Sequence, residues 1–310
     1  ELADHIPHAN ARWAGALYTP NDLRAEPWVA VPALARAAVE DGVTIIENCA
    51  VRMLDIEGGA VTGVITEKGR IKSERVALAG GSWSSLLLRR HGVSIPQLSV
   101  RATVAATDAL PEVVSDSGVD DRLAWRRRAD GGYSLAPSGF HELFVGPDAF
   151  RAAMGFLPQL RQDPLGTRYL PAAPKGFPDA WGTKRRWSAD KQSPFEKMRI
   201  LNPKPNARKV EKLAREFAGT FPSLGAVTIK DAWAGMIDVM PDVVPVVDAC
   251  AALPNLTICT GMCGHGFGIG PAFGRITAKL MQGQETGHDL SRFRLSRFSD
   301  GSTLELGPNL

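Results

Sequence analysis

Apolar residues recur at helical spacing in two stretches of the chain. The first set lies on one helical face and consists of Val31, Leu34, Ala35, Ala38 and Val39. Gly42 can end this helix ahead of an apolar run at residues 43–46, so the order predicts a helix followed by a strand of the parallel type. The second set, Val210, Leu213, Ala214 and Phe217, predicts another helix much later in the chain.

Short β-rich runs separated by glycine turns follow the first helix. The runs cover residues 50–56, 60–66 and 71–78, and the turns contain Gly58-Gly59 and Lys68-Gly69. Such runs with tight glycine turns are typical of antiparallel strands. This part of the sequence therefore predicts a small antiparallel meander that returns to a buried strand.

Between residue 96 and about residue 230 the pattern changes to strands mixed with irregular segments. Strands are expected at residues 97–106, 123–128, 132–136, 142–146 and 227–229. Residues 159–205 are rich in proline, glycine and charge, which predicts a long functional or partner-facing loop. The tail from residue 289 shows no clear period. We expect a mixed-sheet domain here.

The most distinctive segment is a glycine-rich loop at residues 261–275 that follows an apolar strand at residues 256–260 and continues into an amphipathic helix. Glycines let the backbone approach a ligand closely, and Pro271 suits the first position of a helix. The free amides at the helix start favour an electron-rich or anionic group. A tight strand-to-helix turn without a ligand is the alternative interpretation of this loop.

Two further motifs occur in order along the chain. Residues 75–84 form an apolar strand that ends in Gly80-Gly81, and residues 233–247 read WAGMIDVMPDVVPVV. Together with the loop at residues 261–275, they resemble the D-amino acid oxidase family of flavoproteins, in particular its branch near sarcosine- and dimethylglycine-oxidising enzymes. The likeness is collinear over nearly the whole chain.

The resemblance implies an α/β fold in which a Rossmann-like FAD-binding domain is interleaved with a mixed antiparallel-sheet substrate domain. The implied substrate-domain segments are residues 1–26 and 96–232. The implied FAD-binding segments are residues 27–95 and 233–288, followed by a tail at residues 289–310.

One element of the family pattern is missing from this sequence. The family binds the flavin pyrophosphate on a G-x-G-x-x-G turn between its first strand and helix, and this chain has no such turn. A buried parallel strand cannot easily be dispensed with, because its loss leaves an open sheet edge. We therefore expect the chain to be a C-terminal portion, with a companion N-terminal fragment or subunit that supplies the fingerprint.

The resemblance also implies an activity and a cofactor. The expected reaction oxidises the C–N bond of a small secondary or N-substituted amino acid, sarcosine-like or an iminodicarboxylate, by hydride transfer to flavin N5, and water then hydrolyses the imine. The implied FAD-binding residues are Val51, Ala79, Gly80, Gly81, Trp83, Gly235, Gly264, His265, Gly266, Phe267 and Gly268. Cys263 does not match the position of the family's covalent tether, so noncovalent FAD is expected.

Four residues are candidates for the substrate side, each with a structural alternative. Tyr133 could bind a carboxylate or pack across strands. Arg101 could bind a carboxylate through bidentate hydrogen bonds or lie exposed on a sheet. His265 could accept a proton or hold a flavin carbonyl, or it could brace its loop. Asp238 could accept a hydrogen bond from a substrate amine or cap a turn, and the turn is favoured.

The sequence departs from ordinary D-amino acid oxidases near Asp238. Family members that bind amino acids often carry an arginine shortly before a T-P-D motif, but here that place reads Ile237-Asp238, and Met240 replaces the common threonine. Two other functions stay open. The same hydride geometry serves a 2-hydroxy acid oxidase or dehydrogenase, and a noncatalytic half of a flavoprotein complex would lack the fingerprint.

The composition limits the classes of protein and of partner that remain possible. With 310 residues, 44% of them hydrophobic, and a net charge of +3, the chain has an ordinary globular composition. Neither of its two short basic clusters belongs to a longer basic tract, so no nucleic-acid partner is expected. No membrane span or signal peptide is visible. The four cysteines show neither zinc-ribbon spacing nor a disulfide framework, which favours reduced thiols, a cytoplasmic protein and no metal.

Overall fold

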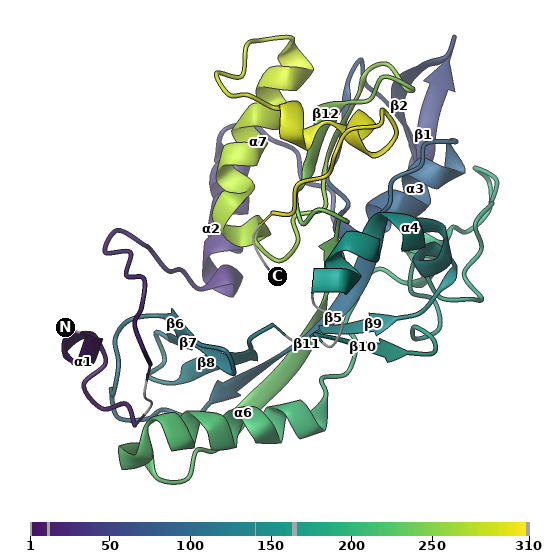
Figure 1. Ribbon diagram of the computed structural model, residues 1–310. Helices are drawn as coiled ribbons and strands as arrows, with labels where there is room; N and C mark the ends of the chain where they lie inside the picture. Colours follow the sequence, from purple (N-terminus) through teal and green to yellow (C-terminus); the bar gives the residue numbers. More distant parts are fainter. Residues whose placement is uncertain (1, 11–12, 140, 163–165, 308–310) are drawn as a thin grey trace. The chain divides into compact units, whose positions relative to one another are not determined.

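The computed structural model describes residues 2–10, 13–139, 141–162 and 166–307 (Figure 1). The chain forms two compact units, each built from three separate stretches. The first unit contains Glu1–Glu47, Ala102–Phe140 and Asn202–Gly235, and the second contains Asn48–Arg101, His141–Leu201 and Met236–Leu310. The predicted α/β class is confirmed. The assignment of sequence segments to a cofactor or a substrate domain stays a prediction.

The first unit contains an antiparallel sheet, two helices of 14 residues and shorter helical segments. Its elements are α1 (Leu2–His5), α2 (Pro27–Glu40), β6 (Gly118–Val119), β7 (Leu123–Arg127), β8 (Tyr133–Pro137), α6 (Ala207–Thr220) and the 3-10 turn η2 (Pro222–Leu224). Strands β6, β7 and β8 follow one another in antiparallel order, and β8 pairs with the end of β5 (Leu98–Thr107). Helix α6 buries Leu213 and Phe217 in a cluster with Trp125, Tyr133 and Phe221.

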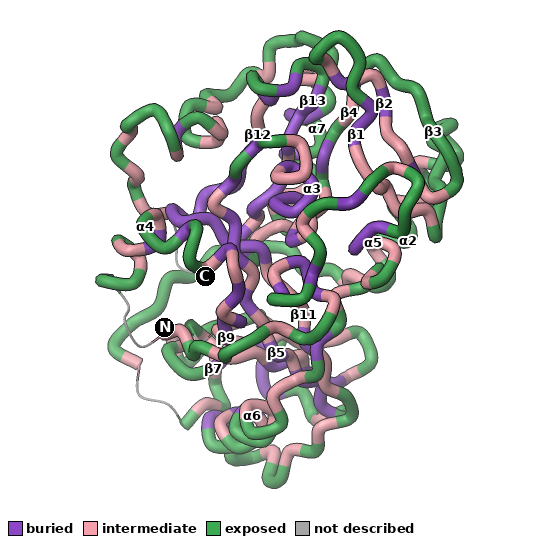
Figure 2. Tube along the Cα trace, turned by 90° about the vertical axis from the view of Figure 1, so that its right-hand side faces the viewer, coloured by how far each residue is buried: buried purple, intermediate pink, exposed green. Residues whose placement is uncertain are grey.

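The second unit contains the predicted antiparallel meander and a separate three-stranded sheet. The meander consists of β1 (Val51–Glu57), β2 (Ala60–Thr66) and β3 (Gly69–Lys72). The other sheet has the order β12-β13-β4, formed by Val246–Ala249, Leu256–Thr260 and Val76–Leu78. Strand β13 runs parallel to β4 and antiparallel to β12. Strands β12 and β13 are largely buried (Figure 2).

The remaining elements of the second unit are helical or short. They are η1 (Gly81–Trp83), α3 (Ser84–Arg90), β9 (His141–Phe144), α4 (Pro147–Gln162), β10 (Thr167–Leu170), α5 (Pro194–Lys197), α7 (Gly266–Gln282), η3 (Ser291–Phe293) and η4 (Leu295–Phe298). Strand β10 pairs in parallel with β9, which pairs with the start of β5. Strand β11 (Ile229–Val239) passes from the first unit into the second along the chain, as β5 does in the opposite direction.

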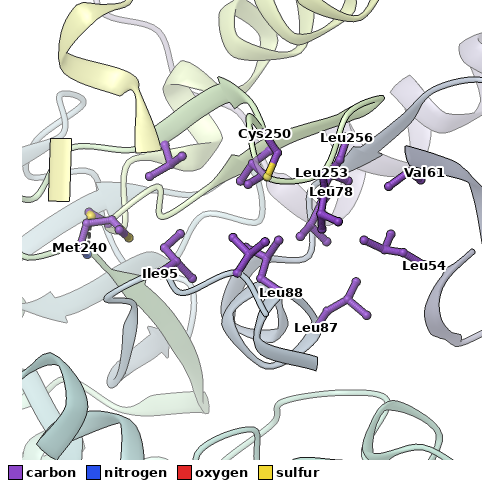
Figure 3. Close-up of a cluster of buried hydrophobic side chains, with 14 of the residues drawn as sticks. Leu54, Val61, Leu78, Leu87, Leu88, Ile95, Met240, Cys250, Leu253 and Leu256 are labelled. Carbon is purple, nitrogen blue, oxygen red and sulfur yellow. Dashed lines mark hydrogen bonds between the residues drawn. The ribbon is translucent and has the colours of Figure 1, made fainter. Parts of the chain in front are cut away.

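An apolar cluster joins the meander, the three-stranded sheet and α3. Figure 3 shows Leu54 and Val61 of the meander beside Leu78 of β4, and Leu87 and Leu88 of α3 on the same cluster. Met240, Cys250, Leu253 and Leu256 belong to the same cluster. The burial of these side chains fixes β4 and β13 in place, and with them the loops that leave their ends.

Several sequence-based expectations need correction. Residues 43–46 form no strand, because no described segment pairs with them. The run at residues 71–78 is divided between β3 and β4, which belong to different sheets. Helix α7 begins at Gly266, so Pro271 lies inside the helix and not at its first position. Part of the expected long loop is structured, since α4 extends to Gln162 and β10 follows.

His91, the C-cap residue of α3, is a titratable group in the second unit. Its Nε2 accepts a hydrogen bond from Leu54 N at 3.0 Å. Burial, with Arg90 adjacent, lowers the pKa of His91 from 6.5 to about 4. A lowered folded-state pKa stabilises the protein above the unfolded value, and this contribution is lost as the pH falls from 6.5 towards 4.

We therefore expect the free energy of unfolding to fall by roughly 1–2 kcal/mol across this window, after allowing for solvent screening of a partly exposed group. Urea denaturation at a series of pH values measures the change. His91→Gln keeps an acceptor that does not titrate, so its curve should be flatter between pH 6.5 and 4. An identical pH dependence in that variant would assign the effect to other groups.

Candidate cofactor and active site

Two glycine loops lie side by side because the strands before them are neighbours. Strand β4 leads into the first glycine loop, residues 79–83, and β13 leads into the second, residues 261–268. The two strands are parallel, with Val76 opposite Leu256 and Leu78 opposite Ile258. Ligands in α/β folds bind at the carboxyl ends of parallel strands, so this edge is the natural place for a cofactor.

The second glycine loop requires its glycines for conformational reasons. Gly261 has φ +74°, and a Cβ there would lie 2.5 Å from the Met240 side chain. Gly264 has φ +83°, and even Cys263 adopts a left-handed φ of +51°. Left-handed backbone is costly for residues with a Cβ, so this loop shape depends strongly on its sequence.

The start of α7 presents unpaired backbone donors. The carbonyl of His265 accepts from the amides of Gly268 and Ile269 at 3.1 and 3.2 Å. Within the described ranges, the amides of Gly264, Gly266 and Phe267 have no hydrogen-bond acceptor. Phe267 is 50% exposed, and Gly268 is exposed as well. A 17-residue helix places its positive dipole end here, which suits an electron-rich or anionic ligand group.

The first glycine loop is held on both sides. Gly81 opens the 3-10 turn with φ +51°. The Ser82 hydroxyl donates to the carbonyl of Met236 at 3.4 Å. The half-buried Trp83 ring packs edge-on against Phe195, with ring centroids 5.4 Å apart. Ala79 remains exposed next to the turn.

Asp238 lies between the two loops as a buried hydrogen-bond acceptor. Its Oδ2 accepts from the amide of Gly261 at 2.7 Å and from Gln97 Nε2 at 3.1 Å. Its backbone carbonyl accepts from the Cys263 amide at 3.0 Å. These contacts favour the structural interpretation of Asp238 over a direct contact with a substrate amine, and a substrate contact stays a prediction.

The thiol of Cys263 is enclosed. Its Sγ donates to Gly261 O at 3.1 Å and accepts from the Met240 amide at 3.3 Å. Burial raises the pKa of Cys263 to about 12, which disfavours the thiolate that a covalent link would need. Cys263 is therefore poorly suited to a covalent tether, and noncovalent attachment of FAD stays a prediction.

Tyr133 and Arg101 are occupied by protein partners. Tyr133 is 0% exposed, and its hydroxyl donates to Val114 O at 3.0 Å. Arg101 forms an ion pair with the buried Glu142 through Nε and Nη2, at 2.8 and 2.7 Å. The structure thus favours cross-strand packing for Tyr133 and an internal ion pair for Arg101, neither of which leaves the group ready for a substrate carboxylate.

Three predicted site residues remain: His265, Val51 and Gly235. His265 is the N-cap residue of α7, and within the described structure its imidazole makes no hydrogen bond, so it is still available to a ligand. Val51 begins β1 and is half-buried. Gly235 lies in β11 in the first unit, where a Cβ would meet no heavy atom within 4 Å. Their ligand contacts stay predictions.

The chain also matches a known protein family. A model of FAD-dependent oxidoreductases (DAO) matches residues 1–280. The chain belongs to the DAO family of FAD-dependent oxidoreductases.

Individual relatives agree with the family match. The chain is 38% identical over 96 residues to a D-amino acid dehydrogenase of Rhizobium rhizogenes, covering 31% of this chain and 23% of that protein. It is 31% identical over 141 residues to mitochondrial sarcosine dehydrogenase of Mus musculus, covering 42% and 15%. An L-amino acid deaminase from Proteus myxofaciens, solved with anthranilate, superimposes with a TM-score of 0.86 at 27% identity, covering 96% and 66%. These matches span less than two thirds of each relative's length.

The described residues fit part of an FAD. A glycine-lined helix start with free amides suits the electron-rich flavin end, and the first glycine loop offers exposed backbone beside it. A Cβ at Gly268 would meet no heavy atom within 4 Å, so this glycine is not needed for internal packing. Its lack of a side chain is explained if the cofactor approaches the helix there.

Sequence reasoning missed the polar side chains beneath the loops. Gln97, Ser84 and Thr260 are all buried and hydrogen-bonded to each other or to Asp238. Their sequence positions carried a weak signal, because Gln97 begins one predicted strand and Thr260 ends another. In the described part of the chain no cluster of metal-ligating side chains is found, and no helix has the length and hydropathy to cross a bilayer.

Proposed function

We propose that the protein is an FAD-dependent oxidoreductase that oxidises the C–N bond of a small secondary or N-substituted amino acid. The observation that carries this proposal is the pair of glycine loops at the carboxyl ends of β4 and β13, with free amides at the start of α7. Family membership supports the redox class. The partial match to a sarcosine dehydrogenase supports an N-methylated or related secondary amine.

FAD, when bound, supplies the ring that accepts a hydride. The chain's own contribution is to bind and orient. The free amides of Gly264, Gly266 and Phe267 would hold the electron-rich pyrimidine end, and the α7 dipole would stabilise negative charge there. The exposed Phe267 ring would exclude water beside the loop. His265 is the one predicted catalytic side chain whose hydrogen-bonding groups are not already used by the described residues.

A substrate panel tests this proposal. The natively isolated protein is mixed without oxygen with secondary and N-substituted amino acids, primary D- and L-amino acids, and 2-hydroxy acids. We expect secondary or N-substituted amino acids to bleach the flavin absorbance, with 2-hydroxy acids as the negative control. Bleaching by 2-hydroxy acids alone would establish the competing hydroxy-acid activity, and bleaching by primary amino acids alone would overturn the substrate class.

We further propose that a companion segment or subunit binds to the first unit and supplies the pyrophosphate-binding turn. The support is an apolar surface on α2 and the residues that follow it. Trp28, Val31 and Leu34 are 49%, 54% and 67% exposed, and Val43, Ile45 and Ile46 are also about half exposed. Contiguous exposed apolar side chains mark an interaction surface. Native mass spectrometry should find an accompanying polypeptide or a longer chain; a mass equal to this sequence alone would contradict the proposal.

A further inference from the structure

A single buried hydrogen-bond cluster links the two glycine loops. It consists of Gln97, Asp238, Thr260 and Ser84, which are 3%, 9%, 1% and 0% exposed. Gln97 Nε2 and Thr260 Oγ1 each lie 3.2 Å from the carbonyl oxygen of Gly81 in the first loop. The same two atoms lie 3.1 and 3.3 Å from Asp238 Oδ2, which also accepts from the Gly261 amide of the second loop at 2.7 Å.

The contacts of Gln97 assign the two polar atoms of its side-chain amide. The amide of Ser85 donates to Gln97 Oε1 at 3.0 Å, so the other amide atom of Gln97 is the nitrogen with two donors. Three acceptors lie within reach of these two donors: Gly81 O of the first loop, Asp238 Oδ2 of β11 and Thr260 Oγ1, at 3.2, 3.1 and 3.0 Å. Thr260 adds one donor and lies 3.0 Å from the Ser84 hydroxyl, at the start of α3. The two loops are therefore connected through buried side chains.

We propose that Gln97 and Thr260 are positioning residues for the cofactor: through Asp238 and the Gly81 carbonyl, they hold the two glycine loops in the mutual placement that FAD binding requires. This inference rests on the proposed function. Buried polar groups are costly when a partner is lost, so removal of one donor should release both loops and not only its own.

Thr260→Val tests the proposal, because it removes the hydroxyl at nearly constant volume. Two readouts are taken on the natively isolated protein: the dissociation constant for FAD, and deuterium uptake by peptides that cover residues 79–84 and 261–264. We expect about a tenfold weaker FAD affinity, and faster exchange in both loops, including the first loop, which is distant from Thr260 in the sequence. Thr260→Ser, which keeps the hydroxyl, should restore both values.

Thr66→Val is the matched control. Thr66 is 3% exposed, lies in the same unit, and donates to a glycine carbonyl, Gly69 O, at 2.7 Å in the meander. It should lose comparable stability while FAD affinity and exchange in the two loops stay at wild-type values. Should Thr260→Val fail to fold, Gln97→Met removes the other bridging donor and is measured in the same way.

The outcomes distinguish failure of the positioning role from failure of the proposed function. Equal weakening of FAD binding by Thr66→Val and Thr260→Val, or faster exchange confined to residues 261–264, would overturn the positioning role. A wild-type protein that binds no FAD would refute the proposed function itself, whatever the exchange data show. Faster exchange in both loops together with weaker FAD binding and rescue by serine would support the inference.

Discussion

Gly268→Val is expected to abolish detectable FAD binding while the protein remains folded. Gly268 is the third residue of α7, it is exposed, and an added Cβ would touch no heavy atom of the protein within 4 Å. The helix itself should tolerate the change, since valine is a slightly better helix former than glycine. The new methyl groups would project where the cofactor must approach the backbone. A loss of about 100-fold in affinity, near 2.7 kcal/mol, is the expected minimum.

Gly219→Val provides the control for this variant. Gly219 is likewise an exposed helical glycine, in α6, with no heavy atom within 4 Å of an added Cβ. Both variants should unfold at or slightly above the wild-type denaturant midpoint, and Gly219→Val should keep its flavin. FAD titration followed by fluorescence quenching measures the difference. Wild-type affinity in Gly268→Val would show that the cofactor does not lie against the start of α7.

Arg297→Met is expected to cause the largest loss of stability. Arg297 lies in η4, and its guanidinium donates to Asp242 through Nε at 2.7 Å and Nη2 at 3.1 Å. Both side chains are only 4% exposed. Nη2 also donates to Val244 O at 2.6 Å, in the turn where Val243 has φ +56°. Removal of the arginine leaves a buried carboxylate without its cation, at a cost of about 3–5 kcal/mol.

Arg294→Met is the control for burial, because it removes an arginine from a more exposed ion pair in the same region. Arg294 pairs with Asp300 at 3.0 Å, but the two side chains are 36% and 34% exposed. An exposed pair of this kind is worth about 1 kcal/mol or less. Chemical denaturation of both variants gives the comparison, and adding Asp242→Asn to Arg297→Met should recover part of the loss. A cost for Arg297→Met no greater than that for Arg294→Met would contradict a stabilising buried pair.

Local sequence patterns predicted the elements whose periodicity or turn residues lie within the element itself. The meander of β1, β2 and β3 follows its glycine turns, and β13 has the bounds expected from its apolar run. The helical period of Leu213 and Phe217 led correctly to α6, because one face of that helix is buried. These features depend on neighbours within a few residues, which is the range that periodicity and turn chemistry report.

Features that depend on distant partners were not predictable in the same way. Residues 43–46 have the composition of a strand, but a strand forms only where another segment pairs with it. The cluster of Gln97, Asp238 and Thr260 joins residues separated by more than 100 positions, and only the parallel pairing of β4 and β13 brings its loops together. Tyr133 and Arg101 were predicted as substrate-binding residues. In the structure, Tyr133 donates a hydrogen bond to Val114 O and Arg101 forms an ion pair with Glu142.

The visible absorption spectrum of the natively isolated protein, taken together with any segment or subunit that accompanies it, tests the central claim most directly. The account predicts the two-banded spectrum of an oxidised flavin, released as free FAD when the protein is denatured, as expected for noncovalent binding. A protein that stays colourless on isolation and acquires no flavin spectrum after addition of FAD would contradict the assignment of the two glycine loops as a cofactor site.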